Sequence, residues 1–126
     1  MSLASALAIA GPYVAALFFS ALGIAAMARP HRLLSGFGID VRGADGANEI
    51  RAVYGGFPLG VAGLLLISQF EPDHSSGILL TIAVAAAAMA AGRLASALID
   101  RRIGRLPALF TLFELAIAGL ICAGFP

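Results

Sequence analysis

The chain has 126 residues, of which 60% are hydrophobic and 12% are charged, and its mean hydropathy is +0.97. A soluble domain carries roughly a quarter charged residues, so this composition excludes an ordinary water-soluble fold and predicts a single domain, residues 1–126, that folds in lipid. The net charge of +1 excludes a nucleic-acid-binding surface, and a lone cysteine, Cys122, excludes an intramolecular disulfide.

Four apolar stretches follow one another along the chain, separated by segments that hold almost all the charges. A helix needs roughly 20 residues to cross about 30 Å of hydrocarbon, and each stretch is long enough. Strict alternation of polar and apolar residues is absent, which argues against a membrane barrel. The sequence therefore predicts an all-α fold, a transmembrane four-helix bundle. The expected helices cover residues 3–28, 49–70, 78–99 and 106–125.

The first stretch has a second interpretation as a removable signal peptide, because Ala26-Met27-Ala28 resembles a small-residue cleavage site. A signal peptide has a basic segment before a short apolar one. Here no charged residue precedes Arg29, and the apolar stretch is longer than usual. We therefore interpret it as a retained first helix, ended at Arg29-Pro30 because proline lacks the N–H that a continuing helix needs.

The arginines predict which way the helices cross the membrane, because short cytoplasmic loops retain positive charge. Every arginine except Arg93 lies in residues 29–51 or 101–105. We expect these two connections on the cytoplasmic side. The outer turn, residues 71–77, and both termini are then expected on the non-cytoplasmic side.

The connection over residues 29–48 mixes basic and apolar side chains before a turn region rich in Gly and Asp, so we expect it to lie along the cytoplasmic interface. Asp45 or Asn48 is expected to cap the second helix. This leaves Glu49 in the first turn, where the helix dipole favours a carboxylate.

The second helix also contains Gly56 and Gly60, a G-x-x-x-G pattern that lets helices approach closely in lipid. We favour close packing within the bundle over a dimer face. Pro58, between them, is expected to kink or loosen the helix.

Ionisable residues inside spans are expensive, so they mark structural pairs or functional sites. Arg93 and Glu114 are two such residues, and they are equally far from a turn near residues 103–104. They are therefore expected at the same depth, where an arginine and a carboxylate can pair. Glu49, Arg51 and Tyr54 begin the second helix at the same end and could extend this cluster.

The residues alone leave the role of this cluster open between an ion pair that fixes helix register, a ligand-binding or catalytic pocket, and a route for protons or ions. No cofactor motif is present: we find no phosphate loop, serine elbow or Cys-His metal spacing, and neither histidine lies in a span. The polar outer turn with Glu71, Asp73 and His74 is typical of a solvated turn, so no metal is predicted.

The segment Asn48-Glu49-Ile50-Arg51-Ala52-Val53-Tyr54-Gly55-Gly56, with Gly92-Arg93 and Glu114, resembles the domain of unknown function 4345 family of small bacterial membrane proteins. The resemblance covers most of the chain and implies a four-helix protein of the bacterial cytoplasmic (inner) membrane. It also implies that Glu49, Arg51, Tyr54, Arg93 and Glu114 form one shared feature. It implies no activity.

Three functions are compatible with these residues. The first is a compact bundle that binds a lipophilic ligand or a partner, either a second copy or another membrane protein. The second is a membrane enzyme with isomerase- or hydrolase-like chemistry, in which Glu114 or Glu49 acts as acid/base, Arg93 or Arg51 stabilises negative charge, and Tyr54 donates a proton. The third is a proton-coupled small-molecule carrier. Small multidrug transporters are of similar size, but the first helix here lacks the charge that such a transporter requires.

Overall fold

The computed structural model describes residues 1–125, and within that range every regular element is helical. Four helical segments are long and apolar enough to cross a membrane, which confirms the predicted all-α four-helix fold. The second segment is one continuous helix made of α2, η2 and α3, and a short 3-10 turn, η1, precedes it. The elements are α1 Leu3–Ala28, η1 Ser35–Phe37, α2 Gly43–Ile50, η2 Arg51–Gly56, α3 Phe57–Ile67, α4 Pro72–Asp100 and α5 Arg105–Cys122.

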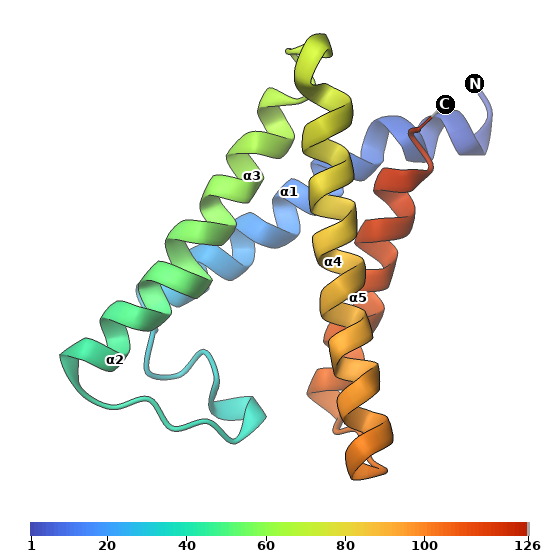
Figure 1. Cartoon of the computed structure of the whole chain (residues 1–126). Helices are drawn as coiled ribbons and strands as arrows, with labels where there is room; N and C mark the ends of the chain where they lie inside the picture. The colour runs from blue at the N-terminus through green and yellow to red at the C-terminus, as the bar shows by residue number, and fades with distance from the viewer. Residues whose placement is uncertain (126) are drawn as a thin grey trace.

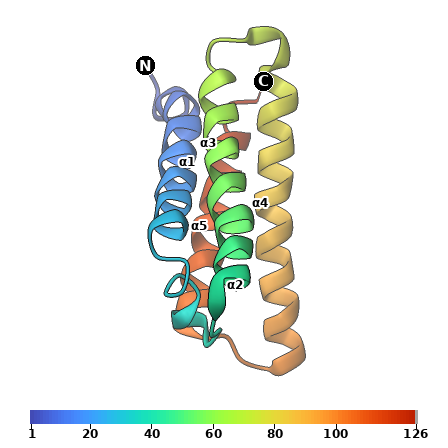
Figure 2. The ribbon, with the colours of Figure 1, turned by 90° about the vertical axis from the view of Figure 1, so that its left-hand side faces the viewer.

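The helices are arranged as two pairs that cross each other (Figure 1). In one pair α1 packs along η2 and α3, and in the other α4 packs along α5, whereas α3 and α4 touch little. The two pairs meet near the short connection between α3 and α4 and diverge toward the opposite end of the molecule (Figure 1). Both termini lie at the end of the α3–α4 connection, and the two arginine-bearing connections lie at the other end (Figure 2).

Two helices begin earlier than the sequence analysis predicted. The second membrane-length helix starts at Gly43 rather than residue 49, with Arg42 as its N-cap and no side-chain cap, so the expected capping by Asp45 or Asn48 was wrong. Asp45 instead lies in the first turn, where its carboxylate faces the positive end of the helix dipole.

The third membrane-length helix, α4, starts at Pro72 rather than residue 78. Proline is well suited to a first helical position, because its fixed φ is helical and its missing N–H would have no partner there. The polar residues that were interpreted as an outer turn over 71–77 are therefore the first turns of α4, and the connection is shorter than expected. The last helix ends at Cys122, slightly before the expected residue 125.

Pro58 loosens the second helix, as predicted. Just before it, the turn from Arg51 to Gly56 is a π-helix, in which the N–H of Phe57 donates to the carbonyl of Ala52 five residues earlier. Proline has no N–H for the normal bond to the carbonyl of Tyr54, and a wider turn accommodates the loss. Such π turns are frequent at functional sites.

Most of the buried apolar core lies in the half of the molecule that holds the termini. It gathers small and branched side chains from all four membrane-length helices, with Leu65 and Ile121 almost fully buried. A smaller cluster of Ala26, Leu34 and Ile50 lies at the other end and holds the long connection against α1. The helix pairs are thus joined firmly at one end, while the other end contains less core.

Glycine allows close helix contact at Gly23 and Gly11 of α1 rather than at Gly56 and Gly60. A Cβ at Gly23 would lie 2.9 Å from the carbonyl oxygen of Gly55, and one at Gly11 would lie 2.7 Å from the carbonyl oxygen of Leu120. A Cβ at Gly60 would meet nothing within 4 Å, and one at Gly56 only the carbonyl of its own helix at 3.7 Å. The expectation that Gly56 and Gly60 pack within the bundle was therefore wrong, because they lie on the outer face of the helix.

Candidate functional site

Arg93 and Glu114 pair inside the bundle, as their positions predicted. The Nε of Arg93 donates to both carboxylate oxygens of Glu114, each at 3.0 Å, and Nη2 lies 3.0 Å from Oε1. The Glu114 side chain is 4% exposed and the Arg93 side chain is 27% exposed. A charge-assisted, multiply bonded pair of this kind neutralises a carboxylate that would otherwise be very costly to bury.

The hairpin of α4 and α5 sets the depth of the pair. Arg101 ends α4 in the left-handed conformation, with φ 53°, which reverses the chain into the connection before α5. The two helices then run antiparallel, and residues equally distant from the turn along each helix lie side by side. Pairing across this turn therefore follows from sequence spacing alone, which is why it could be predicted.

Two aromatic rings pack against the guanidinium of Arg93. Its Cζ lies 5.8 Å from the ring centre of Phe37 and 5.5 Å from that of Phe110, and the two rings are 5.4 Å apart. Phe37 comes from η1 in the long connection and Phe110 from α5. Cation–π contact contributes roughly 0.5–2 kcal/mol, more where water is excluded. Arg93 thus links the connection, α4 and α5 at one point.

A cavity of about 420 Å³ lies between the two helix pairs, at the end where they diverge. Its volume is within the range of about 300–1,000 Å³ typical of small-molecule sites. Every element except α2 contributes to its wall. The lining residues are Phe18, Phe19, Leu22, Leu33, Leu34, Phe37, Ile39, Val53, Tyr54, Phe57, Pro58, Ala86, Met89, Arg93, Phe110, Glu114 and Ile117.

The rim of the cavity is apolar and faces outward. Val53 and Phe57 on one helix pair and Met89 on the other line the cavity and are among the exposed large hydrophobic residues of the chain. Val53 stands on η2, Phe57 on α3 and Met89 on α4, and these helices belong to different pairs (Figure 1). An exposed apolar rim around an apolar cavity is suited to lipid rather than water.

Tyr54, Arg93 and Glu114 are the polar side chains in the lining. Tyr54 is half-buried and comes from the π turn, so the wide turn that Pro58 imposes carries a cavity residue. Tyr54 was expected to join the Arg93–Glu114 pair. The structure brings all three to one cavity, although no hydrogen bond joins Tyr54 to the pair.

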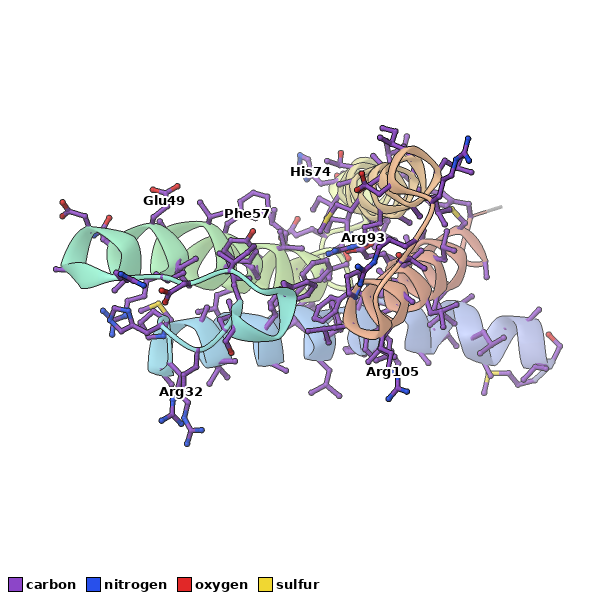
Figure 3. The ribbon with its side chains drawn as sticks, turned by 90° about the horizontal axis from the view of Figure 1, so that it is seen from below. Arg32, Glu49, Phe57, His74, Arg93 and Arg105 are labelled. Atoms are coloured by element: carbon purple, nitrogen blue, oxygen red, sulfur yellow. The ribbon has the colours of Figure 1, made fainter. Side chains whose placement is uncertain are left out.

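Arg93 also borders a second hollow, of about 540 Å³, beside the α4–α5 turn. This groove includes Ser96, Asp100 and Arg102, and its wall is more polar than that of the cavity. The guanidinium therefore stands between an apolar cavity and a polar groove. Seen from below, Arg93 lies between the two helix pairs (Figure 3).

Glu49 and Arg51 do not join the site. Glu49 is exposed and points away from Arg93 (Figure 3). The Nε of Arg51 instead donates to the carbonyl oxygen of Met27 at 3.1 Å, close to the C-terminal end of α1. A cation favours that helix end, where carbonyl groups lack partners. The structure therefore brings together three of the five candidate residues.

The aromatic lining was missed by sequence reasoning. The chain has eight Phe, two Tyr and no Trp, and five of the Phe and one Tyr line this cavity. They come from α1, η1, η2, α3 and α5, so no local pattern in the sequence identifies them. Only Phe18 and Phe19, whose ring centres are 5.5 Å apart, are adjacent in the sequence.

A family model described as "Domain of unknown function (DUF4345)" matches residues 12–125, which confirms the resemblance drawn from the short motifs. No curated protein and no solved structure matches the chain.

Proposed function

The chain belongs to the DUF4345 family of unknown function, and we propose that it is a multi-pass integral membrane protein that holds a lipophilic ligand between its helix pairs. The observation that carries the proposal is the apolar cavity with its outward-facing rim. A molecule dissolved in the bilayer can reach this cavity sideways, between η2–α3 and α4, without crossing water.

We place the protein in the bacterial cytoplasmic membrane with the arginine-bearing connections on the cytoplasmic side. The arrangement of the chain supports this orientation, because the two connections rich in arginine lie at one end of the bundle and the termini at the other (Figure 2). Single cysteines test it in a Cys122→Ser background, using a membrane-impermeant maleimide on intact cells. Ser76→Cys is expected to react from outside and Ile103→Cys only after lysis. Reaction of both from the same side would contradict this topology.

A small molecule suits the cavity better than a partner subunit. An α-helix with its side chains is about 10–12 Å across, and a partner helix would need a long open groove. The hollow between the pairs is instead closed at one end by the main core and at the other by the long connection, which contributes Leu33, Leu34 and Phe37 to its wall.

Binding is favoured over acid/base catalysis and over proton-coupled transport by the state of Glu114. Both of its oxygens accept bonds from Arg93. A general base or a proton carrier needs a carboxylate that can reach substrate or water, whereas this one is buried and engaged. Catalysis or transport would require Arg93 to move away first.

Two matched variants test ligand binding. Val53 lines the cavity and is 47% exposed, while Val84 lies on α4 outside the lining and is 59% exposed. Val53→Trp is expected to obstruct the cavity, and Val84→Trp makes the same chemical change on the outer surface. The protein is reconstituted in liposomes with a photoreactive diazirine-bearing hydrocarbon, and cross-linked residues are mapped by mass spectrometry.

Cross-links to buried cavity residues such as Ala86 and Ile117 are expected in the parent protein, because a ligand between the helix pairs reaches side chains that surrounding lipid does not. They should fall at least fivefold in Val53→Trp and stay unchanged in Val84→Trp, while both variants keep the parent's thermal stability. Labelling confined to outward-facing residues in the parent would refute the proposed function.

A further inference from the structure

We infer that the ligand is an electrically neutral lipophile whose polar end is a flat ring bearing a hydrogen-bond acceptor, such as a carbonyl oxygen. The inference rests on the proposed function and names the chemical class of the ligand. It follows from three properties of the cavity: its aromatic wall, its charge balance and the kind of hydrogen-bonding groups it leaves unused.

The aromatic wall favours a ring. Six of the chain's ten aromatic side chains (eight Phe and two Tyr) line this one cavity. Phe18 and Phe110 pack edge to face with ring centres 6.1 Å apart, so the aromatic side chains present both faces and edges. Aromatic contacts of these kinds add roughly 0.5–1.5 kcal/mol beyond simple burial, a gain that a saturated chain does not obtain.

The charge balance favours a neutral molecule. Arg93 and Glu114 are the charged residues in the lining, and they already neutralise each other. An anionic ligand would place a second negative charge beside Glu114, and a cationic ligand would place a second positive charge beside Arg93. Either arrangement leaves one uncompensated charge in a medium of low dielectric constant, which is strongly unfavourable.

The unused hydrogen-bonding groups favour an acceptor. Both oxygens of Glu114 accept hydrogen bonds from Nε of Arg93, and Nη2 lies 3.0 Å from Oε1 as an ion-pair contact. Nη1 of Arg93 and the hydroxyl of Tyr54 make no hydrogen bond with any of residues 1–125. Both atoms are accessible rather than buried. A guanidinium can only donate, and a tyrosine hydroxyl can donate. The ligand group that both can serve is an acceptor oxygen.

Three probes with the same ring and alkyl chain separate these properties. Decylacetophenone is neutral and carries an acceptor, decylbenzene is neutral without one, and decylbenzenesulfonate carries a full negative charge. Each competes with the photoreactive hydrocarbon for cross-linking at Ala86 and Ile117 in liposomes. The ketone is expected to compete at concentrations about tenfold lower than decylbenzene, the gain expected from one to two net hydrogen bonds. The sulfonate is expected to compete no better than decylbenzene.

Tyr54→Phe removes one donor and is expected to weaken competition by the ketone about fivefold. Competition by decylbenzene should stay unchanged. Tyr13→Phe is the matched control, since Tyr13 is exposed on α1 outside the lining. It should change competition by neither the ketone nor decylbenzene. Equal competition by all three probes, or strongest competition by the sulfonate, would overturn the inference while the proposed function stands. Failure of the hydrocarbon itself to label the cavity would overturn the proposed function instead.

Discussion

Removing either partner of the Arg93–Glu114 pair should lower the free energy of unfolding of the bundle. The two substitutions should lower it by unequal amounts. Arg93→Gln leaves a carboxylate that is 4% exposed without its donors. Loss of one partner from a buried pair costs roughly 3–5 kcal/mol, and we expect about 3 kcal/mol. Glu114→Gln leaves a guanidinium that is 27% exposed and still in contact with two aromatic rings. This smaller loss should be about 1–2 kcal/mol, since cation–π contact and partial hydration remain.

The double variant should recover part of the loss. With both residues changed to Gln, no charge stays buried, and the two amides can form a neutral hydrogen bond worth about 1 kcal/mol. We expect the double variant to be more stable than Arg93→Gln alone. In a double-mutant cycle, the double variant should therefore lose at least about 1 kcal/mol less stability than the sum of the two single losses.

Thermal unfolding in detergent, followed by helical circular dichroism, measures these differences. For a chain of this size, 3 kcal/mol corresponds to roughly 10 °C in the midpoint. Arg105→Gln and Glu71→Gln are matched controls at exposed positions, each expected within about 0.5 kcal/mol of the parent. A larger loss for Glu114→Gln than for Arg93→Gln would refute the argument from burial. Three variants indistinguishable from the parent would refute a stabilising role for the pair.

Gly23→Ala should destabilise the bundle by about 1–3 kcal/mol, because the new Cβ would lie 2.6 Å from Cγ of Leu59. Gly60→Ala adds the same methyl group in open space and should be neutral or stabilise by up to about 1 kcal/mol. Equal effects of Gly23→Ala and Gly60→Ala in the same unfolding assay would contradict the packing described for α1. Phe37→Leu keeps an apolar side chain but removes the ring under Arg93, and a loss of about 1–2 kcal/mol is expected. That loss should shrink when Arg93→Gln is already present, and full additivity would show that ring and guanidinium do not interact.

Sequence reasoning predicted the parts of the structure that depend on local composition and on equal spacing. The four membrane-length helices follow from long apolar stretches, and the Arg93–Glu114 pair follows from equal distances to one turn. Helix starts at Gly43 and Pro72 were harder to predict, because polar residues there resemble a loop. In the structure, these residues belong to the exposed first turns of helices, where polar side chains carry no penalty.

The cavity could not be predicted, because it depends on how the two helix pairs diverge. Neither the crossing nor the aromatic lining leaves a periodic pattern in the chain: Phe37 lies in a connection, while Phe57 and Phe110 stand on helices that are far apart in sequence. Glu49, by contrast, was predicted to belong to the site and does not line the cavity. It shares a short motif with Tyr54, yet the helix directs the two side chains differently, and only Tyr54 reaches the cavity.

In the membrane orientation proposed above, the divergence of the helix pairs also shapes how the molecule fits a bilayer. The ribbons of α3 and α4 lie close together at their connection and far apart at the end that holds the arginines (Figure 1). Such a wedge displaces more lipid from one leaflet than from the other. We expect the protein to favour regions of membrane curvature that relieve this mismatch, and occupation of the broad end by a ligand to strengthen that preference.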